Sequence, residues 1–296
     1  MHITLKFSDF FTKEIFCKIM TTKMPLGLSR STLFRSFSTN KRKDTAGILV
    51  IGDEILKGQT EDTNSRYLTK EIYKMGVKVK KISVIGDVVS EVSEEVKFFS
   101  KSFDKVITTG GIGPTHDDIT FEAVAKAFNE PLVLDPTLHK LCMKFYNTTN
   151  ANIPGMKMAF IPQSAKLNFK SNISSQPLIY PNISIHNVYM FPGIPELLIK
   201  TFRSVKDGIF RNNEHYFTKC LYLNTSESDI VQILDTVVRQ HPEVQFGSYP
   251  KLSNKQYQVK LTIESSSEQN TTLAYEKLLQ LLPEGSIVNI NDIEEK

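Results

Sequence analysis

From Ala46 onward, short apolar runs alternate with helical patterns, and this alternation constrains the fold more than any other feature. Gly47–Ile51 is wholly apolar, as is typical of a strand buried on both faces. Lys105–Thr109 and Val188–Phe191 are predicted to be strands of the same sheet. Between the strands, apolar residues recur at helical spacing, for example in Thr63–Met75. Such alternation predicts an α/β domain with a mainly parallel sheet covered by helices on both faces.

The other elements predicted in this first domain are a strand at Val77–Ile85, a helix with Val92, Val96, Phe99 and Phe103 on one face, and helices at Ile119–Phe128, Pro136–Tyr146 and Pro195–Val205. The stretch Asn147–Asn187 is different, because it is rich in Asn, Ser and Pro. Its pattern favours no particular element.

A second pattern begins near Asn212 and predicts a smaller α+β domain. Its strands are expected at His215–Leu223, Val244–Gly247, Gln256–Ile263 and Ser286–Ile290, and its helices at Glu227–Gln240 and Thr271–Leu282. The order βαββαβ is that of ferredoxin-like domains. Gly247–Pro250 is interpreted as a turn. We therefore expect a leader at 1–44, a large α/β domain at 45–211 and a small domain at 212–296.

The leader differs from the rest of the chain in charge. Residues 1–44 contain nine basic and three acidic residues, whereas the remainder contains 27 basic and 29 acidic residues. Met24–Ser38 has Arg, Ser, Leu and Phe but no acid, which is typical of a transit peptide. We predict import into the mitochondrial matrix, with Met20 and Met24 as internal starts for a cytoplasmic form. The alternative is that the leader carries no targeting signal.

Charge and composition also exclude several kinds of partner and site. The nearly neutral body lacks the basic surface that nucleic-acid binding requires, so no nucleic-acid partner is expected. No apolar run is long enough to span a bilayer, so no membrane partner is expected either. Three cysteines without a CxxC spacing exclude a disulfide scaffold and a cysteine-based zinc site.

Two loops follow predicted parallel strands at their carboxyl ends, where α/β sheets bind ligands. One is Gly52–Gly58, and the other is Thr108–Thr120, which contains Gly110, Gly111 and Gly113. Glycines let the backbone approach a bulky anion, and successive N–H groups form a nest for it. The second loop also leads into a helix N-terminus, which favours negative charge. The pattern predicts a cradle for phosphate or pyrophosphate.

The same loops carry acids, namely Asp53, Glu54, Asp117 and Asp118. These would repel a bare phosphate, and a divalent cation such as Mg²⁺ between carboxylates and phosphate resolves the conflict. A cap on the following helix is the alternative role for Asp117 or Asp118. Pro192–Glu196 follows another buried strand and is either a third wall of the site or a rigid turn.

Together these motifs resemble the molybdopterin-binding (MoCF) domain family. The loops at Gly52–Gly58, Asp62–Ser65 and Thr109–Thr120 are similar to the branch shared by CinA-type proteins and the N-terminal half of animal and protist FAD synthases. Phe191–Glu196 matches the third motif of that branch, and Val244–Pro250 resembles the small domain that follows it. The resemblance implies a three-layer MoCF-type α/β domain and covers nearly all of the chain after the leader.

The resemblance also implies a function, namely metal-dependent hydrolysis of a dinucleotide pyrophosphate such as FAD or ADP-ribose. It implies catalytic roles for Asp53, Asp117 and Asp118, and a Mg²⁺ or Co²⁺ ion held by Asp53, Glu54 and Asp118. Residues expected to bind the nucleotide or pterin-like ligand are Gly52, Asn64, Gly110, Gly111, Gly113, Pro114, Thr115 and Gly193.

Two alternatives stay open. One is a catalytically idle domain that binds a flavin nucleotide or regulates a synthase, and the other is a molybdopterin adenylyltransferase. The chain ends at Lys296, before any PAPS-reductase-like synthase domain, so we expect no FAD synthase activity and a separately encoded synthase as a partner. A homodimer is expected from the family.

Overall fold

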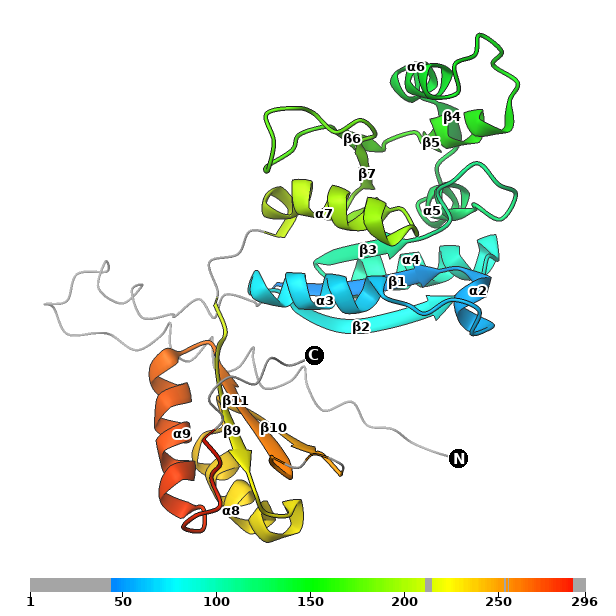
Figure 1. Ribbon diagram of the computed structural model, residues 1–296. Helices are drawn as coiled ribbons and strands as arrows, with labels where there is room; N and C mark the ends of the chain where they lie inside the picture. Colours follow the sequence, from blue (N-terminus) through cyan, green and yellow to red (C-terminus); the bar gives the residue numbers. More distant parts are fainter. Residues whose placement is uncertain (1–43, 211–214, 253, 255, 290–296) are drawn as a thin grey trace, which may run out of the picture. The chain divides into compact units, whose positions relative to one another are not determined.

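The computed structural model describes residues 44–210, 215–252, 254 and 256–289. Apart from Asp44, the expected leader lies outside the described residues. The large domain is built on a six-stranded sheet with the strand order β2-β1-β3-β8-β7-β6 (Figure 1). The strands are β1 (Thr45–Ile51), β2 (Lys78–Ile85), β3 (Lys105–Thr109), β6 (Lys166–Asn168), β7 (Asn182–Ile185) and β8 (Val188–Phe191). Strands β2, β1, β3 and β8 are parallel, and β7 alone runs in the opposite direction, antiparallel to both β8 and β6. The predicted mainly parallel sheet is therefore confirmed.

Helices cover both faces of this sheet, which confirms the three-layer prediction. Helices α3 (Asn64–Lys74) and α7 (Pro195–Phe210) pack on one face, and α4 (Val89–Ser102) and α5 (Thr120–Ala127) pack on the other. Strand β1 is buried from Ala46 onward because its successive side chains enter the two cores in turn. Ile48 lies in the core with α3 and α7, and Leu49 lies in the core with α4 and α5.

The segment whose pattern favoured no element contains several short ones. Within 147–187 these are the 3₁₀ helix η2 (Pro154–Ala159), β5 (Phe160–Pro162), β6 and β7. Strand β5 pairs with β4 (Leu132–Leu134), which precedes this segment and was not predicted either. The predicted helix at Pro136–Tyr146 is confirmed as α6 (Pro136–Phe145). Strands of only three residues, such as β4, β5 and β6, are too short to show a period of two. They therefore leave no signal in the sequence.

A tight hairpin between β7 and β8 reverses the chain direction in this sheet. His186 occupies the turn with a φ of +50°. The next residue, Asn187, donates from its side chain to the carbonyl oxygens of Ser100 and Phe103, at 3.0 and 2.9 Å. These bonds tie the hairpin to the C-terminal end of α4.

The small domain has a three-stranded antiparallel sheet in the order β10-β11-β9 (Figure 1). Its elements are β9 (Phe217–Leu223), α8 (Glu227–Gln240), β10 (Gln245–Pro250), β11 (Val259–Ser265) and α9 (Glu268–Leu281). Their order follows the predicted one as far as α9. Both helices contribute to one core with the three strands.

Two predictions for the small domain are wrong. Gly247–Pro250 is not a turn but the second half of β10, where Gly247 is opposite Thr262. Because β10 is an edge strand, Pro250 lies where its missing N–H costs little. The final strand expected at 286–290 is, as far as residue 289, only a bridge between Leu223 and Ile287. Backbone hydrogen bonds from Asn224 N–H to the Ser286 carbonyl and from Val288 N–H to the Tyr222 carbonyl, both at 2.8 Å, accompany it. Across the described residues, no helix is both long and apolar enough to cross a membrane.

Candidate functional site

The carboxyl ends of β1, β3 and β8 meet at one place on the edge of the large sheet. A Cβ atom on Gly110 would lie 2.0 Å from the carbonyl oxygen of Ile51, the last residue of β1. A Cβ atom on Gly193, which follows β8, would lie 3.2 Å from the Cα of Gly110. The first approach leaves no room for a side chain, so position 110 requires glycine, whereas the contact at Gly193 is tight. The structure thus brings Gly110 and Gly193 together, as the prediction of a common site required.

Asn64 joins two of these strand ends. It is the first residue of α3 and is only 9% exposed. Its Nδ2 donates to the Gly193 carbonyl oxygen at 2.7 Å and to the hydroxyl of Thr109 at 3.1 Å. The Thr109 hydroxyl in turn donates to the carbonyl oxygen of Pro192 at 3.0 Å. The predicted ligand-binding residue Asn64 therefore also holds the loops after β3 and β8 in place.

The loop after β3 turns its carbonyls inward. Gly110 and Gly111 have φ angles of +103° and +63°, which favour glycine. Their carbonyl oxygens accept hydrogen bonds from the hydroxyl and the N–H of the fully buried Thr120, at 2.8 and 2.9 Å. Within the described residues, the N–H groups of Gly111, Ile112 and Gly113 have no acceptor. A run of free N–H groups of this kind can bind an anion.

Asp118 closes the second half of this loop. Its Oδ2 accepts hydrogen bonds from the N–H and the hydroxyl of Thr115, at 2.7 and 2.6 Å. Its carboxylate lies against the backbone of Gly113, where a Cβ atom would approach it to 2.6 Å. Helix α5 begins only at Thr120 and has no side-chain cap, so the capping role considered for Asp118 is not observed.

The remaining predicted residues of this loop are exposed. Pro114 and Thr115 lie on the outer side of the turn, and Asp117 is exposed beside them. The side chain of His116 is 98% exposed, and its Nδ1 lies 3.8 Å from Asp117 Oδ1. Asp117 is therefore exposed to solvent, whereas the Asp118 carboxylate stabilises the turn through its hydrogen bonds with Thr115.

Sequence reasoning missed Asp87, which pairs with the predicted residue Asp53. The Asp53 N–H donates to Asp87 Oδ2 at 3.0 Å, and the Asp87 N–H donates to Asp53 Oδ1 at 3.3 Å. This exchange needs a glycine at position 86, where a Cβ atom would lie 2.5 Å from Asp53 Oδ1. A signal was present, because Gly86 and Asp87 directly follow a predicted parallel strand, β2, whose carboxyl end lies at the same sheet edge.

Asp53 begins a single helical turn, α2 (Asp53–Leu56), where a loop had been expected. Lys57 donates to Asp53 Oδ2 at 2.9 Å. This hydrogen bond, followed by that from the Asp87 N–H, lowers the pKa of Asp53. Glu54 folds back over Gly52, where a Cβ atom would lie 2.6 Å from its Oε1.

Three other carboxylates act electrostatically on Asp87. Burial raises the pKa of Asp87, and the negative charges of Asp53, Glu54 and Asp117 raise it further. We call Asp53, Glu54, Asp87 and Asp117 the acid cluster. It brings together the ends of β1 and β2 and the loop after β3 (Thr108–Thr120), which we call the glycine loop. Asp118 is not among the charges that act on Asp87.

The acid cluster fits one kind of metal site. In the part of the chain that is described, no three His, Cys, Asp or Glu side chains are placed to hold a metal ion unaided. The expected ligands Asp53, Glu54 and Asp118 are therefore not a ready-made group. Mg²⁺ prefers oxygen ligands and often takes only one or two carboxylates, the rest coming from water and substrate phosphates. The cluster suits a cation of this type, shared with a bound phosphate.

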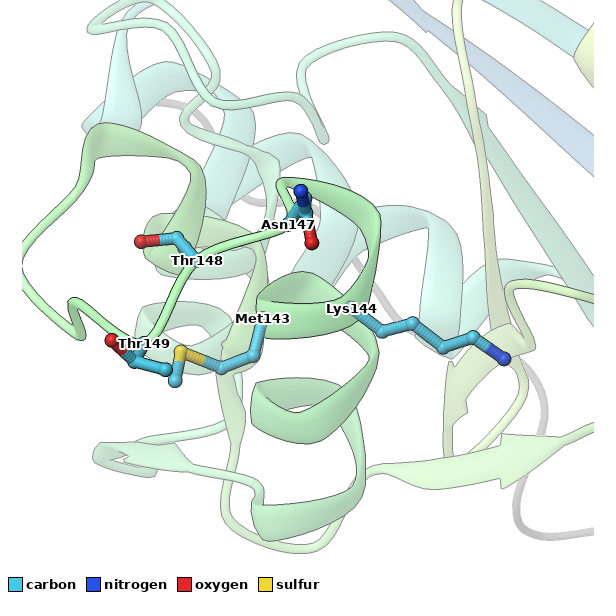
Figure 2. A pocket seen from close by; sticks show the side chains of 5 residues that line it. All are labelled: Met143, Lys144, Asn147, Thr148 and Thr149. Atoms are coloured by element: carbon cyan, nitrogen blue, oxygen red, sulfur yellow. The ribbon is translucent and has the colours of Figure 1, made fainter.

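An open surface depression lies elsewhere, at the C-terminal end of α6 (Figure 2). Its lining residues are Met143, Lys144, Asn147, Thr148 and Thr149. Figure 2 shows the side chains of Met143 and Lys144 extending in different directions, so the lining groups do not converge on one point. None of these residues belongs to the strand-end loops.

Comparisons with known proteins agree with this architecture. Residues 47–211 match the family described as "Probable molybdopterin binding domain", and residues 215–291 match "FAD synthase, middle domain". A "Probable FAD synthase" of Caenorhabditis elegans is 37% identical over 270 residues, which cover 84% of this chain and 52% of that protein. A "CinA-like protein" of Fusobacterium nucleatum is 35% identical over 199 residues, which cover 66% of this chain and 47% of that protein.

The chain spans about half the length of these curated relatives. Among solved structures, the protein CinA of Thermoplasma acidophilum, described as of unknown function, shares 26% identity at a TM-score of 0.51. That match covers 56% of this chain and 98% of the other. Residues 215–291 thus resemble the middle domain of FAD synthases, and the chain as a whole belongs to the molybdopterin-binding domain family.

Proposed function

We propose that this chain binds a dinucleotide pyrophosphate of the FAD or ADP-ribose class and hydrolyses its diphosphate with the help of Mg²⁺ or Co²⁺. One observation carries the proposal. The N–H groups of Gly111, Ile112 and Gly113, which lack an acceptor among the described residues, lie in the same loop as Asp117, whose charge acts on Asp87. Anion donors and clustered carboxylates thus share one site.

These two features call for a ligand that combines phosphate with a cation. The N–H groups suit one phosphate of the diphosphate, which would accept hydrogen bonds that the protein leaves unmade. The acid cluster would repel the same diphosphate on its own. A bound divalent cation would neutralise that charge and polarise the phosphorus toward attack.

The surroundings of Asp53 and Asp87 shift their pKa values in opposite directions, which suits the two acids to different roles. Asp53 stays ionised because Lys57 lowers its pKa, so it suits a cation ligand, with Glu54 beside it. Asp87, whose pKa is raised by burial and like charges, suits the acceptance of a proton from the attacking water. Water would add its oxygen to one phosphorus, the bond from that phosphorus to the bridging oxygen would break, and the bridging oxygen would leave with the second mononucleotide.

Binding without turnover is a second candidate. It is favoured by the finding that no three potential ligands in the described ranges hold a metal unaided. In that case the domain would bind a flavin nucleotide and regulate a synthase. Adenylyl transfer to molybdopterin is less well supported, because residues 215–291 match the middle domain of FAD synthases.

The decisive experiment is a metal-dependence assay on the full chain. FAD, ADP-ribose and NADH would each be incubated with EDTA, Mg²⁺ or Co²⁺, and the release of mononucleotides followed by chromatography. We expect cleavage only with metal, and a fall of at least about 100-fold in kcat for Asp53→Asn, since an ionised group in the reaction site is lost. Glu61→Gln, an exposed acid nearby, should leave the rate unchanged.

The other outcomes assign the alternatives. Cleavage that Asp53→Asn retains in full would contradict the proposed role of Asp53. Ligand-induced thermal stabilisation without cleavage under any metal would support the binding domain. Formation of adenylylated molybdopterin from molybdopterin and ATP would support adenylyl transfer.

A further inference from the structure

Lys157 places a positive charge at the rim of the glycine loop, although it lies far along the chain in η2. Its Nζ donates to the carbonyl oxygens of Thr115 and His116, at 2.6 and 3.2 Å. Among the described residues it forms no ion pair, whereas Lys57 is matched by Asp53.

The turn that carries Lys157 is firmly anchored. Its neighbours Met156 and Ala159 are buried in the core on the α4 and α5 side of the sheet. The Met158 carbonyl oxygen accepts a hydrogen bond from the Tyr180 hydroxyl at 3.1 Å. Gly155 packs directly on a ring, since a Cβ atom there would lie 2.0 Å from Tyr146 Cε2. The backbone beneath Lys157 is therefore held in position before any ligand binds.

The contacts of Lys157 leave it capable of binding a further group. An ammonium has three donors, and the two carbonyls take two of them. Carbonyl oxygens carry no net charge, so the positive charge of Lys157 is not neutralised by these partners. The side chain is also only half-buried, which leaves it accessible. A charged donor bound to the same loop as the free N–H groups provides what a phosphate oxygen requires.

We propose that Lys157 binds the diphosphate of the nucleotide while it holds the Thr115–His116 turn in place. This inference rests on the proposed function. In this arrangement the free N–H groups and Lys157 contact the phosphate oxygens, and the acid cluster faces the cation. The two halves of the site then carry opposite charges, which selects a diphosphate with its cation over an uncharged ligand.

The test is equilibrium binding of ADP with Mg²⁺ to the full chain, measured by calorimetry. ADP carries the diphosphate with only one nucleoside, so it measures recognition of the diphosphate apart from that of a dinucleotide. Lys157→Met should weaken binding by about 10- to 100-fold, as expected for the loss of a charged hydrogen bond. Lys157→Arg should stay within about threefold of the wild type, because it keeps a charged donor. Lys144→Met, an exposed lysine on nearby α6, is the matched control and should bind normally.

A third variant separates charge from support of the turn. Lys157→Gln keeps an N–H donor for the carbonyls but removes the charge, so it should bind as weakly as Lys157→Met and melt at the temperature of the wild type. Normal binding by Lys157→Gln would overturn a role for the charge. Equal loss in Lys157→Arg and Lys157→Met would do the same, because it would indicate support of the turn alone.

The outcomes for this inference and for the proposed function are distinguishable. If the wild type cleaves FAD or ADP-ribose and Lys157→Met binds ADP as well as the wild type does, only the role of Lys157 is wrong. If the wild type binds ADP without cleaving any dinucleotide, and Lys157→Met binds weakly, hydrolysis is wrong and the role of Lys157 is supported. A wild type that binds no diphosphate overturns both.

Discussion

Single atoms decide the geometry of the site, and the glycines show this most directly. At Gly110 the obstacle is the backbone oxygen of Ile51, which cannot rotate away as a side chain would. At Gly86 the obstacle is the Asp53 carboxylate, so a methyl group there would break the paired contacts of Asp53 and Asp87. At both positions, a larger residue would collide with a specific neighbouring group.

Gly110→Ala should destabilise the large domain by about 3 kcal/mol or more, because the added methyl meets backbone and the φ of +103° is unfavourable for alanine. Urea unfolding measures this loss. Gly208→Ala is the matched control, since it lies in α7 with open space around its Cβ position. It should stabilise the helix by up to about 1 kcal/mol. Equal stability of the two variants would contradict the backbone clash at Gly110.

At the scale of elements, helices α3 and α7 are joined across the sheet face that they share. Glu71 on α3 accepts hydrogen bonds from Lys206 on α7 at 2.8 Å and from Lys74 on its own helix at 2.7 Å. These two contacts, with Lys206 the larger cause, lower the pKa of Glu71 to about 2. The carboxylate therefore stabilises the packing of the two helices only while it is ionised.

This ion pair predicts a pH dependence of stability. Because the pKa of Glu71 is lowered on folding, its contribution is complete above its ordinary pKa of 4.5 and is lost as the pH falls toward about 2. Glu71→Gln should therefore cost about 1–3 kcal/mol at pH 7 and almost nothing at pH 2. Urea unfolding across this range measures the difference. Glu94→Gln, an exposed acid on α4, should show no such dependence, and a parallel loss in both variants would contradict the assignment.

Elements with a strong period were predictable, and short or locally determined ones were not. The bounds of β3, β8 and α8 agree with those expected from the sequence, since buried runs and amphipathic faces determine them. Strand β4 has only three residues, and nothing in its composition separates it from a loop. Asp87 was missed although its position after a strand pointed to it. Lys157 was not predictable, because its place at the site depends on how the segment 147–187 folds back.

At the scale of the whole molecule, the near-neutral body and the basic leader give rise to separate predictions. The described residues account for the fold and the candidate site, and the address predicted for residues 1–44 depends on the sequence alone. Fusion of residues 1–44 to a fluorescent protein should direct it to mitochondria in eukaryotic cells, as an acid-poor basic segment predicts. Replacement of Arg30 and Arg35 by Glu should leave the fusion in the cytosol. A diffuse signal from the unaltered leader would contradict the predicted address.

The free N–H groups of Gly111, Ile112 and Gly113 lie only a few residues from the ladder of β3, and this closeness has a consequence for amide hydrogen exchange. Strand amides exchange only when the sheet opens, whereas amides without a protein acceptor exchange from the native state. Protection should therefore fall steeply between Thr109 and Gly111. A bound anion would restore protection in the loop alone, so exchange at these three amides would report occupancy of the site while the sheet beneath stays unchanged.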